Sequence, residues 1–258
     1  MRSSLEEIRT RRERLAELLR REGYLSVGEL ASRFHISEAT VRRDLRVLEK
    51  DHKVTRTHGG ALFEYDELFL PFYQRHMLRQ DVKRSIARAV LPLVGEAGVI
   101  FLDAGSTVFC LAQMLVETGM EGHTFVTNSL PVAEAVMDLP RSEVHLLAGC
   151  LLPHQLVLLG PGTDLSLVPW NFHLAVMGVE AMDSDGLWNS REQIVEFQRH
   201  VCARSRRVVF CADSSKIGRR GPSFLLPWRL VDMVATDADL KQLERLGPEA
   251  GGVRWLRS

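Results

Sequence analysis

The sequence predicts an α/β protein in which a small winged helix-turn-helix precedes an open, Rossmann-like sheet. Two observations lead to this prediction. Residues 1–60 hold three amphipathic helical patterns and a β-prone run, and the rest of the chain alternates short apolar runs with helical patterns. With 258 residues, the chain can hold a small and a medium domain. We therefore expect two domains, 1–62 and 81–258, joined by a linker at 63–80.

The formal net charge is zero, but it is unevenly distributed. Residues 1–60 carry 14 Lys/Arg against 10 Asp/Glu, whereas the remainder carries 19 against 23. A basic small domain on an acidic larger one indicates a polyanionic partner, although an Arg-rich solvated helix face would give the same pattern. We find neither a run of about twenty apolar residues nor the apolar core of a secretory signal, so we expect a soluble cytoplasmic protein with no membrane partner.

The cysteines are widely separated and form no Cys-x-x-Cys pair. Buried thiols in apolar runs behave as small hydrophobic side chains. We therefore predict no disulfide, no metal site and no cofactor. The four residues concerned are Cys110, Cys150, Cys202 and Cys211.

Three helical patterns fill most of the first fifty residues. The first runs over 8–21, where apolar residues recur at helical spacing. The second opens on a capping-box pattern, Ser26 followed by Glu29, and is short and one-sided. The third follows Ser37, a favourable N-cap. The apolar stripe of this third helix consists of Val41, Leu45 and Leu48.

The face of the third helix opposite that stripe is basic. Such a helix fits the major groove, where its first turns reach base edges and its Arg and Lys side chains neutralise phosphates. Residues 54–61 are β-prone and close on Gly59-Gly60, which predicts a two-stranded wing. A three-helix bundle that only packs would share the periodicity, but neither the wing nor the basic face. The DNA-binding residues predicted here are Ser37, Glu38, Ala39, Thr40, Arg42, Arg43, Arg46, Arg56, His58 and Gly59.

The rest of the chain alternates strands and helices. Residues 63–80 are irregular and are interpreted as a linker that packs on its neighbours and has little order of its own, after which a helix is predicted over 83–94. Six mostly apolar runs follow, separated mainly by helical patterns, as in a buried parallel sheet. The predicted strands are 99–103, 125–127, 144–147, 174–177, 208–211 and 233–235.

Polar or glycine-containing turns follow several of these strands, at the edge where open α/β sheets bind ligands. A helix that starts at Gly105 would point its free N–H groups at a phosphate, beside the hydroxyls of Ser106 and Thr107. Lys216 would add a positive charge, and Asp103 would accept hydrogen bonds from sugar hydroxyls. Each such turn alone is common in α/β proteins, so the prediction rests on their combination.

These segments resemble the DeoR family of transcriptional regulators. The resemblance spans the N-terminal domain in 26–34, 37–45, 48–49 and 56–61, and continues in Arg75, Lys83-x-x-Ile-Ala87, Asp-x-Gly-Ser-Thr at 103–107, Thr-Asn-Ser at 127–129 and Asp-Ser-Ser-Lys at 213–216. It implies a sensor domain resembling sugar-phosphate isomerases and a phosphorylated, sugar-like effector. The effector-binding residues that the turns and the resemblance together predict are Asp103, Gly105, Ser106, Thr107, Thr127, Asn128, Ser129, Gly149, Glu180, Glu192 and Lys216.

The chain departs from the family pattern mainly in one stretch. Ala148 precedes Gly149 where the family commonly has Gly-Gly, Glu180-Ala181 replaces Asp-Gly, and Trp188 stands where Thr is usual. A longer acid, an added methyl group and a large indole would reshape a small polar pocket. The effector therefore need not be one of the family's common ligands, although Trp188 would also fit a plain packing role.

The sequence therefore predicts a DNA-binding transcriptional repressor controlled by a phosphorylated, sugar-like metabolite. Its partners would be a double-stranded DNA operator and a second copy of itself, in a homodimer or homotetramer. Two alternatives stay open: a sugar-phosphate isomerase-like enzyme with an accessory DNA-binding domain, and an activator in place of a repressor. An isomerase needs a placed acid/base pair and shows turnover, whereas a sensor shows binding alone.

Overall fold

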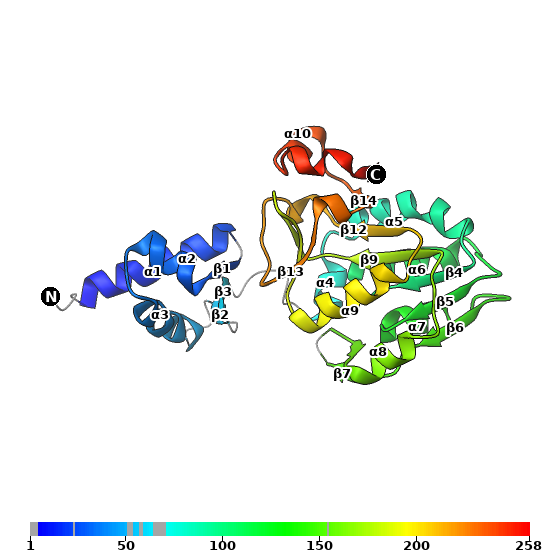
Figure 1. The fold of residues 1–258 in the computed structure, drawn as a ribbon, viewed down its shortest axis with the longest axis horizontal. Helices are drawn as coiled ribbons and strands as arrows, with labels where there is room; N and C mark the ends of the chain where they lie inside the picture. The colour runs from blue at the N-terminus through cyan, green and yellow to red at the C-terminus, as the bar shows by residue number, and fades with distance from the viewer. Residues whose placement is uncertain (1–4, 23, 51–53, 57–58, 64–70, 154) are drawn as a thin grey trace.

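The protein consists of a small N-terminal body and a larger body built on a parallel sheet (Figure 1). The structure is a computed structural model, and it describes residues 5–22, 24–50, 54–56, 59–63, 71–153 and 155–258. No helix in these ranges is long and apolar enough to cross a lipid bilayer.

The N-terminal body packs three helices on an antiparallel sheet of order β1-β3-β2 within the described residues. The three predicted helices and the wing are confirmed, since β2 and β3 pair antiparallel. The elements are α1 (Leu5–Glu22), β1 (Tyr24–Ser26), α2 (Val27–Phe34), α3 (Glu38–Lys50), β2 (Val54–Arg56) and β3 (Gly60–Phe63).

Both predicted starts of the second and third helices are confirmed by their caps. The Ser26 hydroxyl accepts from the Glu29 amide at 3.2 Å, and the Glu29 carboxylate accepts from the Ser26 amide at 2.9 Å. Helix α2 ends at His35, whose φ of 51° is left-handed, and the chain turns there. The Ser37 hydroxyl then accepts from the Thr40 amide at 3.3 Å, which satisfies a free donor of α3.

Strand β1 was not predicted, and it corrects the interpretation of Gly60. Gly60 lies in β3 and not in the wing turn, and it pairs with Ser26 across the sheet. A Cβ atom at Gly60 would lie 2.3 Å from the Leu25 carbonyl oxygen and 2.7 Å from the Tyr24 ring. Glycine is therefore required because β1 and the Tyr24 side chain approach β3 closely.

A buried carboxylate fixes α3 on α1. Asp44 is 1% exposed and accepts from Arg11 Nε at 2.7 Å and from Arg12 Nε at 2.9 Å. Burying a carboxylate is costly unless it is paired and hydrogen-bonded, as Asp44 is here. Together with the apolar stripe, these two bonds fix the rotation of α3, so its basic face points outward.

The sheet of the larger body has seven parallel strands in the order β15-β14-β12-β9-β4-β5-β6. All six predicted strands are confirmed, and β15 at the edge was missed because charged residues begin and end it. The strands are β4 (Val99–Leu102), β5 (Thr124–Thr127), β6 (Glu143–Leu146), β9 (Leu174–Gly178), β12 (Val208–Cys211), β14 (Met233–Thr236) and β15 (Arg254–Arg257).

The order of the strands reverses between β4 and β9. The chain moves outward from β4 to β6, returns to β9, and continues on the other side to β15. Alternate strand residues enter two apolar cores, one on each face of the sheet. The helices over one face are α5 (Gln80–Gly95), α6 (Ser106–Glu117) and α7 (Leu130–Val136), and those over the other include α8 (Pro161–Leu167) and α9 (Glu192–Ala203).

The second half of the predicted linker is ordered, which corrects the sequence interpretation. It contains α4 (Phe72–Met77). Phe72 is completely buried and meets Phe109 of α6 edge to face, with ring centroids 5.3 Å apart. The aromatic residues that looked irregular in the sequence therefore hold this segment on the larger body.

Several short elements that the sequence did not predict complete the larger body. A hairpin of β7 and β8 follows β6, and a small antiparallel sheet of order β10-β11-β13 follows β9. Cys110 and Cys211 are buried as expected, but Cys150, at the start of β7, is exposed. The short elements are β7 (Cys150–Leu152), β8 (Val157–Leu159), β10 (Ala181–Met182), β11 (Gly186–Asn189), η1 (Ser214–Lys216), β13 (Ser223–Pro227), η2 (Trp228–Leu230), α10 (Leu240–Glu244) and η3 (Pro248–Gly252).

Replacing Asp44 by Asn should loosen α3 from α1. The variant loses two charge-assisted hydrogen bonds and buries an amide beside two guanidinium groups, so local stability should fall by about 1.5–3 kcal/mol. Amide hydrogen exchange of peptides from α1 and α3 in the full chain measures this change. The exposed Arg9–Glu13 pair provides the control. Glu13→Gln should change the free energy of local opening, as measured by exchange, by less than about 0.5 kcal/mol. Equal effects of the two variants would contradict the role given to Asp44.

Candidate effector cavity and DNA-binding face

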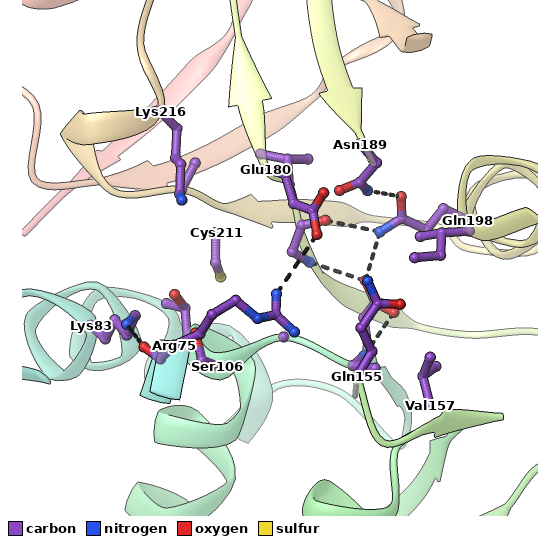
Figure 2. Close-up of a pocket in the computed structure, with 18 of the residues that line it drawn as sticks. Arg75, Lys83, Ser106, Gln155, Val157, Glu180, Asn189, Gln198, Cys211 and Lys216 are labelled. Atoms are coloured by element: carbon purple, nitrogen blue, oxygen red, sulfur yellow. Dashed lines mark hydrogen bonds and ion pairs between the residues drawn. The ribbon is translucent and has the colours of Figure 1, made fainter. Parts of the chain in front are cut away.

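A polar cavity lies at the carboxyl edge of the large sheet, where the strand order reverses. This is the place at which open α/β sheets bind ligands. Figure 2 shows Arg75, Gln155, Glu180 and Lys216 pointing into it from four different elements. The predicted effector-binding residues that line the cavity are Asp103, Gly105, Ser106, Thr107, Asn128, Glu180 and Lys216.

The other four predicted residues lie outside the cavity lining. The Thr127 hydroxyl donates to a backbone carbonyl of the neighbouring strand, and Ser129 caps α7. Gly149 has a φ of 148°, and a Cβ atom there would lie 2.2 Å from the Thr163 hydroxyl. The Glu192 side chain is 62% exposed at the start of α9. The first three therefore shape the loops behind the cavity, and Glu192 faces solvent.

The N-terminus of α6 opens into the cavity. Its N-cap, Gly105, provides no side-chain hydrogen bond, so the first N–H groups of the helix stay available for a ligand. Ser106 and Thr107 line the cavity beside them and are each 8% exposed. The helix dipole and these donors favour a negatively charged group at this point.

A chain of hydrogen bonds crosses the floor of the cavity. Asp103 accepts from the Ala104 amide at 2.8 Å, from the Gly178 amide at 3.2 Å and from Gln198 Nε2 at 2.7 Å. Gln198 Oε1 accepts in turn from Asn189 Nδ2 at 2.6 Å. Burial raises the pKa of the Asp103 carboxyl above its ordinary value, against the lowering effect of these hydrogen bonds. The chain connects β4, α9 and β11 through one buried carboxyl.

A second carboxyl, Glu180, faces a cation on the opposite wall. Its Oε1 lies 3.7 Å from Arg75 Nη1, and both side chains are largely buried (Figure 2). Burial raises the pKa of Glu180 above its ordinary value, although the charges of Arg75 and Lys216 oppose the rise. The Lys83 ammonium donates to the backbone carbonyls of Arg75 and Leu78 and so holds α4 against α5.

Lys216 reaches the cavity from η1, the turn after β12. The neighbouring Asp213 accepts from Arg79 Nη1 at 2.9 Å and from the Ser215 amide at 3.0 Å. Burial raises the pKa of Asp213, but the charges of Lys216 and Arg79 and the bonds from Ser215 outweigh it, so the pKa lies below its ordinary value. Asp213 is therefore an ionised partner that orients the cations around it.

Four buried polar atoms of the lining have no hydrogen-bond partner within the described residues: Asn128 Oδ1, Gln155 Oε1, Glu180 Oε2 and Arg75 Nε. Buried polar atoms are usually paired, so these four would be satisfied by a bound polar molecule or water. The sequence missed Gln155, Asn189 and Gln198 because they come from the β7–β8 hairpin, β11 and α9, in a region without a clear pattern. Two of the noted departures also lie elsewhere, since Ala148 and Trp188 do not line the cavity.

The basic face of α3 is exposed, as the sequence predicts. Ala39, Arg43 and Arg46 are exposed, and Thr40 is half-buried beside them. Arg42 is also exposed but is paired with Glu38 at 2.9 Å, one helical turn earlier. Arg43 and Arg46 thus give this exposed face a positive charge, which is the charge that a polyanion attracts.

An ion pair connects the wing to α3. Arg56 Nε lies 2.7 Å from Glu49 Oε2, and the Arg56 amide donates to the same carboxylate at 3.3 Å. Gly59 is exposed, and its carbonyl accepts from the Val27 amide at 2.9 Å. His58 lies outside the described residues. A phosphate contact by Arg56 would therefore compete with the bond to Glu49.

A winged helix with an exposed basic helix and a sensor-like α/β body define a DNA-binding regulator. Residues 11–66 match the family description "DeoR-like helix-turn-helix domain", and residues 78–238 match "DeoR C terminal sensor domain". The chain belongs to the DeoR family of transcriptional regulators.

Similar curated proteins share nearly the whole length of this chain. The glycerol-3-phosphate regulon repressor of Escherichia coli is 30% identical over 87% of this chain and 88% of its own length. The lactose phosphotransferase system repressor of Streptococcus mutans is 30% identical over 92% and 95%. Among solved structures, ribose 5-phosphate isomerase A from Neisseria gonorrhoeae matches with a TM-score of 0.38 and 19% identity, over 55% of this chain and 54% of that chain.

The buried carboxyl of Glu180 should make stability depend on pH. Because its folded pKa is raised, its protonated form stabilises the fold, and that contribution is lost as the pH rises through the folded pKa. Relative to Glu180→Gln, the parent should therefore lose unfolding free energy as the pH rises from the ordinary glutamate pKa of 4.5 toward neutrality. Urea unfolding of both proteins across this range measures the difference. Glu192→Gln, at an exposed residue, is the matched control, and its difference in unfolding free energy from the parent should not change with pH. If the parent instead gains stability relative to Glu180→Gln as the pH rises, the pKa of Glu180 is not raised.

Proposed function

We propose that this chain is a cytoplasmic transcriptional repressor whose binding to a DNA operator is controlled by a phosphorylated, sugar-like metabolite in the cavity. The observation that supports this most directly is the phosphate-compatible terminus of α6 facing Lys216 inside a cavity of the sensor domain. The printed names of the relatives support it further, since one represses a glycerol-3-phosphate regulon and another a phosphotransferase system.

In DNA binding, we assign sequence choice to the first turns of α3 and much of the affinity to its arginines. Arg43 and Arg46 project from the exposed face, and an arginine can grip guanine with two hydrogen bonds or neutralise a phosphate. Arg56 and Gly59 of the wing would contact the backbone, as we predict for Ser37 at the start of α3. The domain boundaries we propose are 1–62 for DNA binding and 81–258 for sensing, with α4 of the predicted linker packed on the sensing body and lending Arg75 to its cavity.

The cavity has two chemically different ends that suit one ligand. The helix terminus at 105–107 and Lys216 would hold a phosphate, and Asn128 and Gln155 offer unpaired acceptors to sugar hydroxyls. Asp103 already accepts from three donors, so its oxygens are committed to holding the cavity floor. This supports a sensor over an isomerase, and steady turnover of a sugar phosphate would contradict it.

We also propose a homodimer or homotetramer assembled through the larger body. A single winged helix reads only a short site, and two related by a twofold axis can span paired half-sites. Sedimentation velocity at micromolar concentration should give more than one copy per particle, and a monomer both with and without DNA would contradict this.

Replacing Arg43 by Ala should weaken operator binding by about 1–3 kcal/mol and change the preferred sequence, because we expect this exposed side chain to contact a base edge. Fluorescence anisotropy with the operator and with single-base variants measures both effects. Arg141→Ala, which removes an exposed arginine of the larger body paired with Glu121, is the control and should bind like the parent. The hypothesis of a repressor fails if the parent shows no affinity for DNA even at low salt.

Replacing Lys216 by Ala should abolish most of the response to a phosphorylated ligand without affecting the DNA-binding face. A lost charge-assisted contact is worth about 1.5–3 kcal/mol, so affinity should fall roughly ten- to hundredfold. Gly105→Trp should block the site sterically. A thermal-shift screen of sugar phosphates finds the ligand, and operator release then measures the response. The exposed Lys241→Ala is the control, and a normal response of both cavity variants would exclude a phosphate at these turns.

A further inference from the structure

One arginine of the larger body contacts both halves of the molecule. Arg220, in the loop before β13, has its Nε 2.7 Å from Asp183 Oδ2 and also pairs with Asp185, on the turn between β10 and β11. Its Nη1 lies 3.7 Å from Glu29 Oε1 of the N-terminal body, and its carbonyl accepts from the Tyr24 amide at 3.3 Å. Figure 1 shows the β13 region as the part of the larger body beside β1 and β3.

In the N-terminal body, Arg220 contacts a residue whose side chain is already held by hydrogen bonds. Glu29 is the N3 residue of the capping box of α2, and its Oε2 accepts from both the amide and the hydroxyl of Ser26. Its other oxygen faces Arg220. Helix α2 packs on the recognition helix α3, and the Val27 amide holds the wing residue Gly59. A shift of Arg220 would therefore move the DNA-reading unit as a whole.

On the sensor side, the same arginine rests on a strand that lines the cavity. Its guanidinium lies 4.8 Å from the centre of the Trp188 ring, and Trp188 Nε1 donates to Asp183 at 2.8 Å. The next residue in β11 is Asn189, which lines the cavity and ends the hydrogen-bond chain from Asp103.

The residue after Arg220 packs closely against β11, so that only a glycine fits there. A Cβ atom at Gly221 would lie 2.8 Å from the Asn189 carbonyl oxygen and 3.1 Å from Trp188 Cβ. The Trp188 carbonyl also accepts from the amide of Glu180, the cavity carboxyl, at 3.1 Å. Glu180 and Asn189 are thus joined to the backbone of Trp188, whose indole lies against Arg220, so a displacement of either is passed to Arg220 through that residue.

We propose that Arg220 is the positioning residue that couples the effector cavity to the DNA-reading body. It acts as a clamp, because it joins β11 to the start of α2. Ligand contacts to Asn189 and Glu180 change the strength of its ion pair with Glu29. This proposal rests on the proposed function. The structure also assigns a role to Trp188, the indole at a position where the family usually has Thr: it is the platform for Arg220 and no part of the cavity wall.

Hydrogen exchange of the full chain tests the clamp without DNA or ligand. The reporter is the peptide 22–34, which retains the Tyr24 amide and the start of α2. Arg220→Ala should speed exchange there by about two- to fivefold, the effect expected of one partly exposed ion pair with its backbone contact. Glu29→Gln should do the same, because Gln keeps the capping box but removes the charge. Arg229→Ala, an exposed arginine of η2, is the control and should change nothing.

A second pair of variants tests the connection from the cavity to the clamp. Asn189→Ala should speed exchange of the same peptide although Asn189 does not touch the N-terminal body in the described residues, whereas Asn128→Ala, across the cavity, should not. Peptides from β4 and β12 report whether each variant is folded. Unchanged exchange in Arg220→Ala would overturn the clamp, and an unchanged Asn189→Ala would overturn its coupling to the cavity. Both outcomes are independent of operator binding, so they are distinct from failure of the proposed function.

Discussion

The cavity exists because the connections that leave β4 and β9 run to opposite faces of the sheet. Helix α6 follows β4 on one face, and α9 comes after β9 on the other, so the two neighbouring strands end in a crevice that neither helix fills. Asp103 lies at this point, and its carboxyl accepts from the Ala104 amide after β4, from the Gly178 amide at the end of β9 and from Gln198 of α9. Every other feature of the site depends on that reversal, since it turns the start of α6, Lys216 and Glu180 toward a common space.

Buried polar groups are used differently in the two bodies. In the N-terminal body, Asp44 is fully satisfied by Arg11 and Arg12, and this fixes the face that α3 presents. In the cavity, burial raises the pKa of Asp103 and Glu180, and Asn128 and Gln155 keep acceptors unpaired. The first arrangement stabilises a single geometry, whereas the second leaves interaction energy that a ligand can gain, which is what a switchable site requires.

The sequence predicted the elements whose pattern repeats along the chain. It did not predict contacts between residues that are far apart in the sequence. Helical periodicity and caps predict α1 to α3, and apolar runs predict six strands of the large sheet, because local burial determines both. The three turns that follow β4, β5 and β12 were predicted from composition and do reach the cavity. Gln155 and Gln198 were not, because only the fold brings a β-hairpin and α9 to that edge. Gly60 was assigned to a turn because a glycine's need for space against β1 and Tyr24 is invisible without the partner strand.

We propose that the cavity and the DNA-reading helix are energetically linked, so that ligand binding and operator binding affect each other. The most direct test is calorimetric titration of a phosphorylated sugar identified by screening, carried out on the protein alone and on the protein saturated with operator DNA. Linkage requires the ligand affinity to change by the same factor by which the ligand changes operator affinity, typically five- to 150-fold. Identical ligand affinity in the two titrations would contradict the account, because a ligand that binds both states equally cannot control the DNA.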